Sequence, residues 1–144
     1  MSTLHVAFRV GNAEYAIDAT DVLHLESFTE ATHVPGAQAF VAGVVHVRGK
    51  LVPVVDLRKR FGLEPAARTL DSRVIVVKVG GRVAGLLVDS ARDVVRLDEA
   101  TFEPPPELLD SDASGFIKAV STQAARLLLV VDVPRLIGEE ASHA

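Results

Sequence analysis

Three aspartates of this 144-residue chain each end an apolar run: Asp56, Asp89 and Asp132. Paired carboxylates can act as a general acid and a general base, so a polar pocket built around these residues would indicate an enzyme or a ligand-binding barrel. Aspartate at the end of a strand is also the expected helix cap or turn former. We favour this structural interpretation. The sequence contains neither a G-x-S-x-G nor a phosphate-binding-loop pattern, and we expect no catalysis.

The histidines offer little metal chemistry. No two of them stand four residues apart and the chain has no cysteine, so a metal site would have to be assembled across the fold. We therefore expect neither a metal nor another cofactor. His24 and His46 alternate with apolar neighbours, which predicts that each lies on the solvent face of a strand. The net charge of −4 and the absence of a basic stripe argue against nucleic-acid binding.

Arg48 and Gly49 form a turn between two β-rich runs, residues 44–47 and 50–55. Glycine at the second position supplies the positive φ that a short hairpin turn needs. A guanidinium on such a rigid turn could bind a carboxylate of a partner with little ordering cost. The alternative is an ordinary solvated turn residue. The residues alone thus indicate a non-enzymatic, β-rich interaction domain.

The elements around this turn are short and mostly extended. Apolar residues make up 49% of the chain and valine dominates them, which favours a packed β-structure. Short helices are expected after Asp56, over residues 57–61, and after Asp132. No basic segment followed by an apolar run marks a signal peptide, and no apolar stretch approaches the ~20 residues of a membrane span. We expect a cytoplasmic protein.

The two halves of the chain match in order. Gly43-Val44-Val45 matches Gly115-Phe116-Ile117, Val54-Val55-Asp56 matches Val130-Val131-Asp132, and the break at Pro35 matches Pro104–Pro106. We therefore predict one domain over residues 1–144, with an internal duplication of about 4–62 and 73–138 and a linker near 64–72. Each half would supply about five strands and a terminal helical turn, which suits a small closed barrel packed on its twin.

Residues 41–62, VAGVVHVRGKLVPVVDLRKRFG, resemble the CheW family of chemotaxis coupling proteins, whose pattern reads GV-x-x-x-RG-x-x-x-P-V-V-D-L-R. Further matches, such as Val34-Pro35, Gly85 to Asp89 and Leu127 to Ile137, extend the resemblance over almost the whole chain. It implies a mainly β fold of two packed five-stranded SH3-like barrels with short helices. It also implies a non-catalytic adaptor that couples methyl-accepting chemoreceptors to the regulatory domain of a CheA-type histidine kinase. Such an adaptor would be a monomer alone, would join arrays or rings with its partners, and would not insert into the membrane.

The resemblance also assigns residues. Arg48 and Gly49 fall on the family's Arg-Gly turn and Val22 on a valine, both associated with receptor contact. His24 stands where many relatives have an acid, and His46-Val47 where they often have Asn-Leu. We place His24 at the kinase surface. An alternative follows from these departures: a divergent member of a dedicated motility or development system that binds receptor but not kinase.

Overall fold

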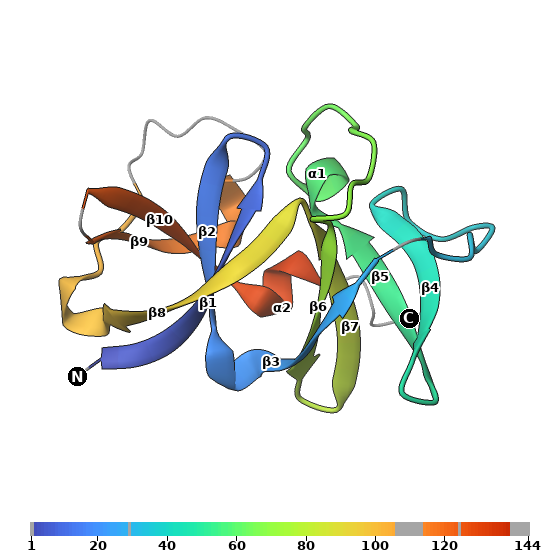
Figure 1. The fold of residues 1–144 in the computed structure, drawn as a ribbon, viewed down its shortest axis with the longest axis horizontal. Coiled ribbons are helices and arrows are strands. Elements are labelled where there is room, and N and C mark those ends of the chain that lie inside the picture. The colour runs from blue at the N-terminus through green and yellow to red at the C-terminus, as the bar shows by residue number, and fades with distance from the viewer. Residues whose placement is uncertain (1, 29, 106–113, 124, 139–144) are drawn as a thin grey trace.

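The computed structural model describes residues 2–28, 30–105, 114–123 and 125–138, and shows two five-stranded sheets side by side (Figure 1). The strands are β1 (Ser2–Val10), β2 (Ala13–Asp18), β3 (Val22–Ser27), β4 (Val41–Val47), β5 (Lys50–Asp56), β6 (Arg73–Val79), β7 (Arg82–Val88), β8 (Ser90–Asp98), β9 (Ile117–Gln123) and β10 (Arg126–Val131). The short helices are α1 (Leu57–Arg60) and α2 (Val133–Leu136), with 3-10 turns η1 (Ala19–Asp21), η2 (Glu99–Thr101) and η3 (Ser114–Phe116). The predicted fold class is confirmed.

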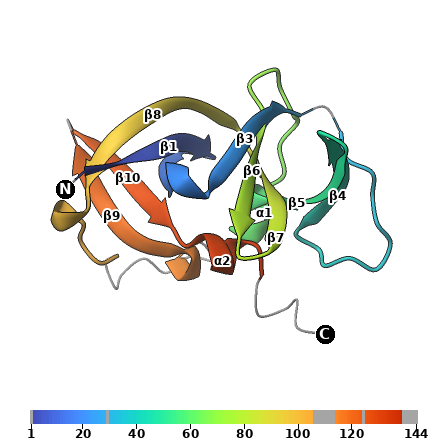
Figure 2. The same cartoon turned by 90° about the horizontal axis from the view of Figure 1, so that it is seen from below.

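Each sheet curls into a small barrel (Figure 2). The first barrel has the strand order β8-β1-β2-β10-β9, and the second has the order β3-β6-β7-β5-β4. Each therefore takes strands from both halves of the chain, and the expectation that each half closes its own barrel is wrong. The exchange gives β2 a parallel neighbour in β10, and β7 a parallel neighbour in β5, so neither hairpin leaves an open edge on that side. The duplication itself stays a prediction.

The largest hydrophobic cluster lies between the two barrels. It combines residues of both sheets with residues of the two short helices, such as Phe8, Ile75, Leu57 and Leu136. Two smaller clusters fill the barrels themselves. Because one core joins the barrels, their outer strands and turns are held in a fixed relation to each other.

The sequence V-V-D occurs in both halves of the chain, and each time its aspartate caps the short helix that follows. Asp56 caps α1 by accepting a hydrogen bond from the Arg58 amide at 3.0 Å, and Asp132 caps α2 by accepting one from the Arg135 amide at 3.3 Å. The amides of both aspartates donate in turn to the carbonyl of a phenylalanine, Phe40 or Phe116, each at 2.8 Å. The predicted capping role of these two acids is confirmed.

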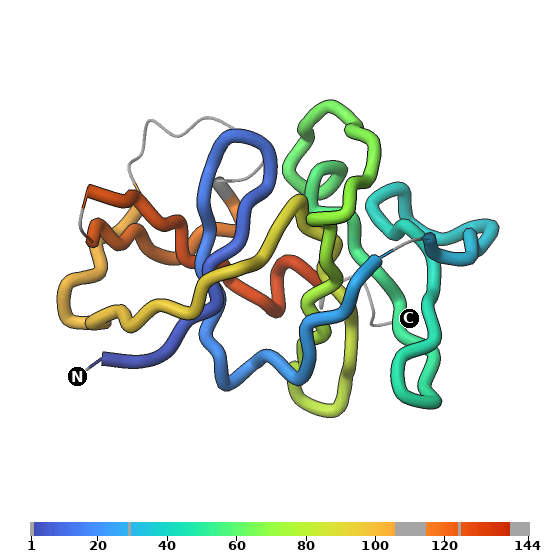
Figure 3. Tube along the Cα trace, in the orientation of Figure 1, coloured from blue at the N-terminus to red at the C-terminus, as the bar shows by residue number. Residues whose placement is uncertain are grey.

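The tube in Figure 3 shows the predicted linker as a loop that rises from α1 before the chain returns into β6. Part of the predicted break at Pro104–Pro106 lies outside the described residues, since Pro106 is not among them. No helix in the described part of the chain has the length and apolarity needed to cross a bilayer.

Candidate functional site

The β4–β5 hairpin ends in a two-residue turn at Arg48 and Gly49, with Val47 and Lys50 as the last paired residues. Both turn residues have positive φ, +51° for Arg48 and +82° for Gly49. This is the pattern of the hairpin turn that matches strand twist, and it normally favours Asn-Gly or Gly-Gly. The positive φ predicted for Gly49 is confirmed. An arginine in the left-handed region costs about 1–2 kcal/mol, so Arg48 occupies a position that turn chemistry alone would not give it.

Among the residues that the structure describes, Arg48 has one acidic partner, Glu26 on β3. Its Nε donates to Glu26 Oε2 at 3.4 Å, while the two side chains stay 66% and 31% exposed. An ion pair this exposed and this long contributes less than about 1 kcal/mol. Arg48 can therefore exchange Glu26 for a carboxylate of a partner at low cost.

Sequence reasoning missed Glu26. It treated the acid expected on this strand as replaced by His24, yet an acid stands two residues later. Because side chains alternate along a strand, residues 24 and 26 face the same side. The period of two was therefore the signal that could have found Glu26.

β3 and β4 are the two outer strands of the second sheet, and the gap between them is the main opening of that barrel. At one end the chain after β3 returns to β4, where the amides of Thr32 and Val44 each donate to the other's carbonyl at 2.9 Å. At the other end the Arg48–Glu26 ion pair crosses from the β4–β5 turn to β3. We call this gap, bounded by the two contacts, the second-barrel seam.

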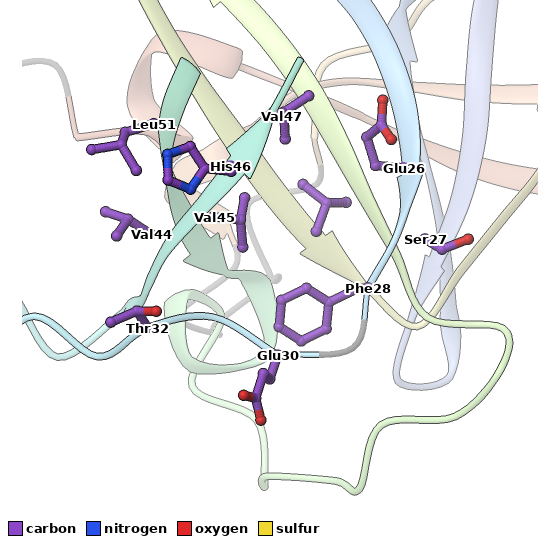
Figure 4. Close-up of a pocket in the computed structure, with 11 residues that line it drawn as sticks. Glu26, Ser27, Phe28, Glu30, Thr32, Val44, Val45, His46, Val47 and Leu51 are labelled. Carbon is purple, nitrogen blue, oxygen red and sulfur yellow. The ribbon is translucent and has the colours of Figure 1, made fainter. Parts of the chain in front are cut away.

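The second-barrel seam holds a groove of about 510 Å³ (Figure 4). Phe28 and Val45 point into the gap, Glu26 lies beside it on β3, and Glu30 lies at the end near Thr32. The groove is lined by Glu26, Ser27, Phe28, Glu30, Thr32, Val44, Val45, His46, Val47, Leu51 and Val74. The groove thus combines apolar residues at its floor with two acids at its margin, and more of its accessible surface is polar than apolar.

His24 lies elsewhere than the sequence predicted. It is half-buried opposite Val76, while Leu23 and Leu25 are 46% and 44% exposed. The expectation of a solvent-facing His24 is wrong, because exposure alternates along β3 with the leucines at the exposed positions and His24 on the partly buried side. His46 is exposed, as predicted.

The structure brings His24 and Arg48 together, since both line one small pocket. It does not bring Val22 to them. Val22 pairs with Val77 and packs against the core between the barrels. Of the two residues predicted from β3, only His24 thus lies beside the Arg48 turn.

Asp89 has a different role from the two capping aspartates. Its carboxylate accepts from Arg58 Nε at 3.0 Å, from Arg58 Nη2 at 2.7 Å and from the Gly11 amide at 2.8 Å. Burial alone would raise the pKa of Asp89, but these hydrogen bonds outweigh it and hold the pKa below its ordinary value. Asp89 therefore ties α1 to the β1–β2 hairpin, and its partners are structural.

Asp56 and Asp89 share Arg58 as a partner and both line a pocket of about 230 Å³, whereas Asp132 caps α2 elsewhere. In that pocket the carboxylate of Asp56 accepts from helix amides and that of Asp89 is paired with a guanidinium, so both have structural partners. Among the described residues, no three His, Asp or Glu side chains gather closely enough to hold a metal ion. The geometry thus favours a protein-binding surface at the Arg48 turn and the second-barrel seam.

Comparison with known proteins agrees with this fold. The model of the CheW-like domain family matches residues 5–141. Chemotaxis protein CheW of Bacillus subtilis is 34% identical over 139 residues, covering 96% of this chain and 89% of the relative. Protein FrzA of Myxococcus xanthus is 31% identical over 127 residues, covering 85% and 78%. The crystal structure of the scaffolding protein TtCheW from Thermoanaerobacter tengcongensis superposes with a TM-score of 0.84 at 32% identity, covering 92% of this chain and 90% of that one. The chain belongs to the CheW-like domain family, as the resemblance of residues 41–62 and the further matches along the chain predicted.

Proposed function

We propose that this chain couples chemoreceptors to a CheA-type histidine kinase, in the cytoplasm at receptor arrays and without catalysis of its own. The observation that carries the proposal is the conformation of Arg48. An exposed guanidinium on a tight turn presents its donors in a fixed direction, and its present partner, Glu26, holds it weakly. A receptor carboxylate would form a charge-assisted bond with little ordering cost.

The other predicted residues would take different parts in the two surfaces. Gly49 would keep the turn narrow, and Val22 would support the receptor surface from the core, against which it packs. His24 would contact the kinase. Because His24 and Arg48 line the same pocket, the receptor and kinase surfaces would meet there, and one rigid barrel would hold both partners at a set spacing.

Arg48→Glu tests the receptor contact. Membranes carrying a chemoreceptor from the same genome are sedimented with the wild type, with Arg48→Glu and with Arg96→Glu, a matched charge reversal on the first barrel. We expect at least a tenfold loss of co-sedimentation for Arg48→Glu and little change for Arg96→Glu. Unchanged binding of a folded Arg48→Glu protein would refute the assignment.

The likeness to FrzA favours a second candidate, a divergent adaptor of a dedicated motility or development system that binds receptor but not kinase. Pull-down with the regulatory domain of the neighbouring kinase gene separates the two. Retention of that domain by the wild type supports the coupling function, whereas receptor binding without kinase binding supports the alternative.

A further inference from the structure

A second, smaller pocket lies under the Arg48 turn. Its volume is about 120 Å³, and it is lined by Leu23, His24, Val47, Arg48, Lys50, Val52, Val76 and Val83. The β4–β5 and β6–β7 turns lie at the same end of the second barrel (Figure 1), and the pocket is at this end. Its valines belong to or pack against the cluster that fills the barrel. The pocket is therefore an open end of the barrel's own core.

The strand β3 borders the pocket with Leu23 and His24. His24 stands opposite Val76, but Leu23 is the additional residue between the paired Val22 and His24. A bulge re-aims the unpaired side chain, and Leu23 is 46% exposed at the wall of the pocket. The apolar floor thus faces solvent past one exposed leucine.

The rim of the pocket carries positive charge. Arg48 and Lys50 both line it, together with the imidazole of His24, and no acid is among its lining residues. Glu26, the partner of Arg48, lines the seam groove instead. In the described part of the chain Lys50 makes no ion pair, so at least one cation of the rim is available to a ligand.

We propose that this pocket binds one branched aliphatic side chain of a partner protein, next to a carboxylate that pairs with Arg48 and Lys50. The volume of about 120 Å³ is a little below the ~150 Å³ of an apolar cavity that accepts benzene, so the pocket can admit the four carbons of a leucine or isoleucine side chain. The cations select an acidic neighbour. The proposal depends on the adaptor function in one respect: that function decides which partner protein supplies the aliphatic residue and its acidic neighbour.

The small molecule 4-methylpentanoate has both a branched aliphatic group and a carboxylate, so it can serve as a probe of the pocket. The wild type is titrated with 4-methylpentanoate and, separately, with the uncharged 4-methylpentanamide, while the valine and leucine methyl groups are followed by NMR. We expect saturable shifts in Val47, Val52, Val76 and Val83, with the amide binding at least threefold more weakly. In the double variant Arg48→Met, Lys50→Met the acid and the amide should bind equally. Absence of shifts at these valines, equal binding of acid and amide to the wild type, or larger shifts at Val44 and Val45 of the seam groove would overturn the proposal.

Two leucine variants separate the pocket from general surface effects. Leu23→Ala removes the pocket wall and should weaken probe binding at least threefold. Leu70→Ala makes the same change at a leucine that is 96% exposed on the loop before β6, and should leave binding unchanged. Equal effects of the two variants would contradict the pocket. Since the probe experiment needs no receptor, failure of the pocket and failure of the adaptor function are read separately.

Discussion

The two barrels have the same opening in their backbone. In the second barrel the chain beyond β3 bridges back to β4 through Thr32 and Val44, with both hydrogen bonds at 2.9 Å. In the first barrel the chain beyond β8 bridges back to β9 through Glu103 and Val120, with hydrogen bonds of 3.0 and 2.8 Å. Each barrel is thus joined at one point and leaves a gap beside it, so the opening is a property of the fold.

The side chains in the two gaps differ. The second-barrel seam has an apolar floor that includes Phe28 and Val45. The gap of the first barrel, about 400 Å³, is lined by Ser2, Arg96, Asp98, Thr101, Ser121, Thr122 and Gln123. The accessible surface does not follow these residue types, because more of it is polar than apolar in the second-barrel seam and more of it is apolar than polar in the gap of the first barrel. The same backbone opening therefore carries aromatic and branched aliphatic residues in one barrel, and mainly hydroxyl, amide and charged residues in the other.

The largest difference in stability between the two barrels is expected when their aromatic residues beside the gaps are replaced. Phe28 is 6% exposed and belongs to the core of the second barrel. Phe28→Ala should lower the free energy of unfolding by about 3–4 kcal/mol, the range for a buried phenylalanine. Phe102, which is only partly buried against the first barrel's core, should cost less when changed to alanine, about 2 kcal/mol. Urea unfolding measures both, and equal losses would mean that the second-barrel seam is no better packed than its counterpart.

The next largest difference in stability is expected between substitutions of two aspartates that each stand at the end of a strand, Asp89 and Asp18. Asp89 is held by Arg58 and by the Gly11 amide, whereas Asp18 accepts from the Thr20 amide and hydroxyl. Asp89→Asn should cost about 1–2 kcal/mol at pH 7, a value reduced by the partial exposure of the carboxylate. Asp18→Asn should cost under about 0.5 kcal/mol, because asparagine caps equally well.

The pH dependence follows from the lowered pKa of Asp89. A carboxyl whose pKa is lower in the folded protein contributes fully above its unfolded value of about 3.9, and loses that contribution as the pH falls through its folded value. The stability difference between wild type and Asp89→Asn should therefore be constant near neutrality and close below about pH 4. A difference that persists unchanged into acid would show that charge on Asp89 is not what stabilises the contact.

The smallest effect on stability is expected at the Arg48 turn. Arg48→Gly loses an exposed ion pair but relieves a left-handed arginine, so the free energy of unfolding should change by less than about 0.5 kcal/mol. Receptor binding by the same variant should fall. A large loss of stability in urea would instead show that Arg48 stabilises the fold through its ion pair across the second-barrel seam.

The sequence predicted what depends on local chemistry. The turn at Gly49 and the caps at Asp56 and Asp132 follow from φ and hydrogen-bond preferences of neighbouring residues. The exchange of strands between halves depends on parallel pairing of distant segments, such as β2 with β10, and no local preference specifies it. The orientation of β3 was inverted because the alternation of side chains shows which residues share a face of the strand but not which face is turned to the core. The sequence did not distinguish the exposed Leu23 and Leu25 from core residues, because an apolar surface and a hydrophobic core are built from the same residue types.

One reconstitution tests the coupling function most directly. Receptor membranes are mixed with the kinase of the same gene neighbourhood, with and without this chain, and the kinase retained on the sedimented membranes is measured. Coupling predicts that wild-type protein retains the kinase severalfold above the level without it, and that Arg48→Glu does not. Kinase retention that is the same with and without the chain, although the chain itself sediments with receptor, would contradict the coupling function.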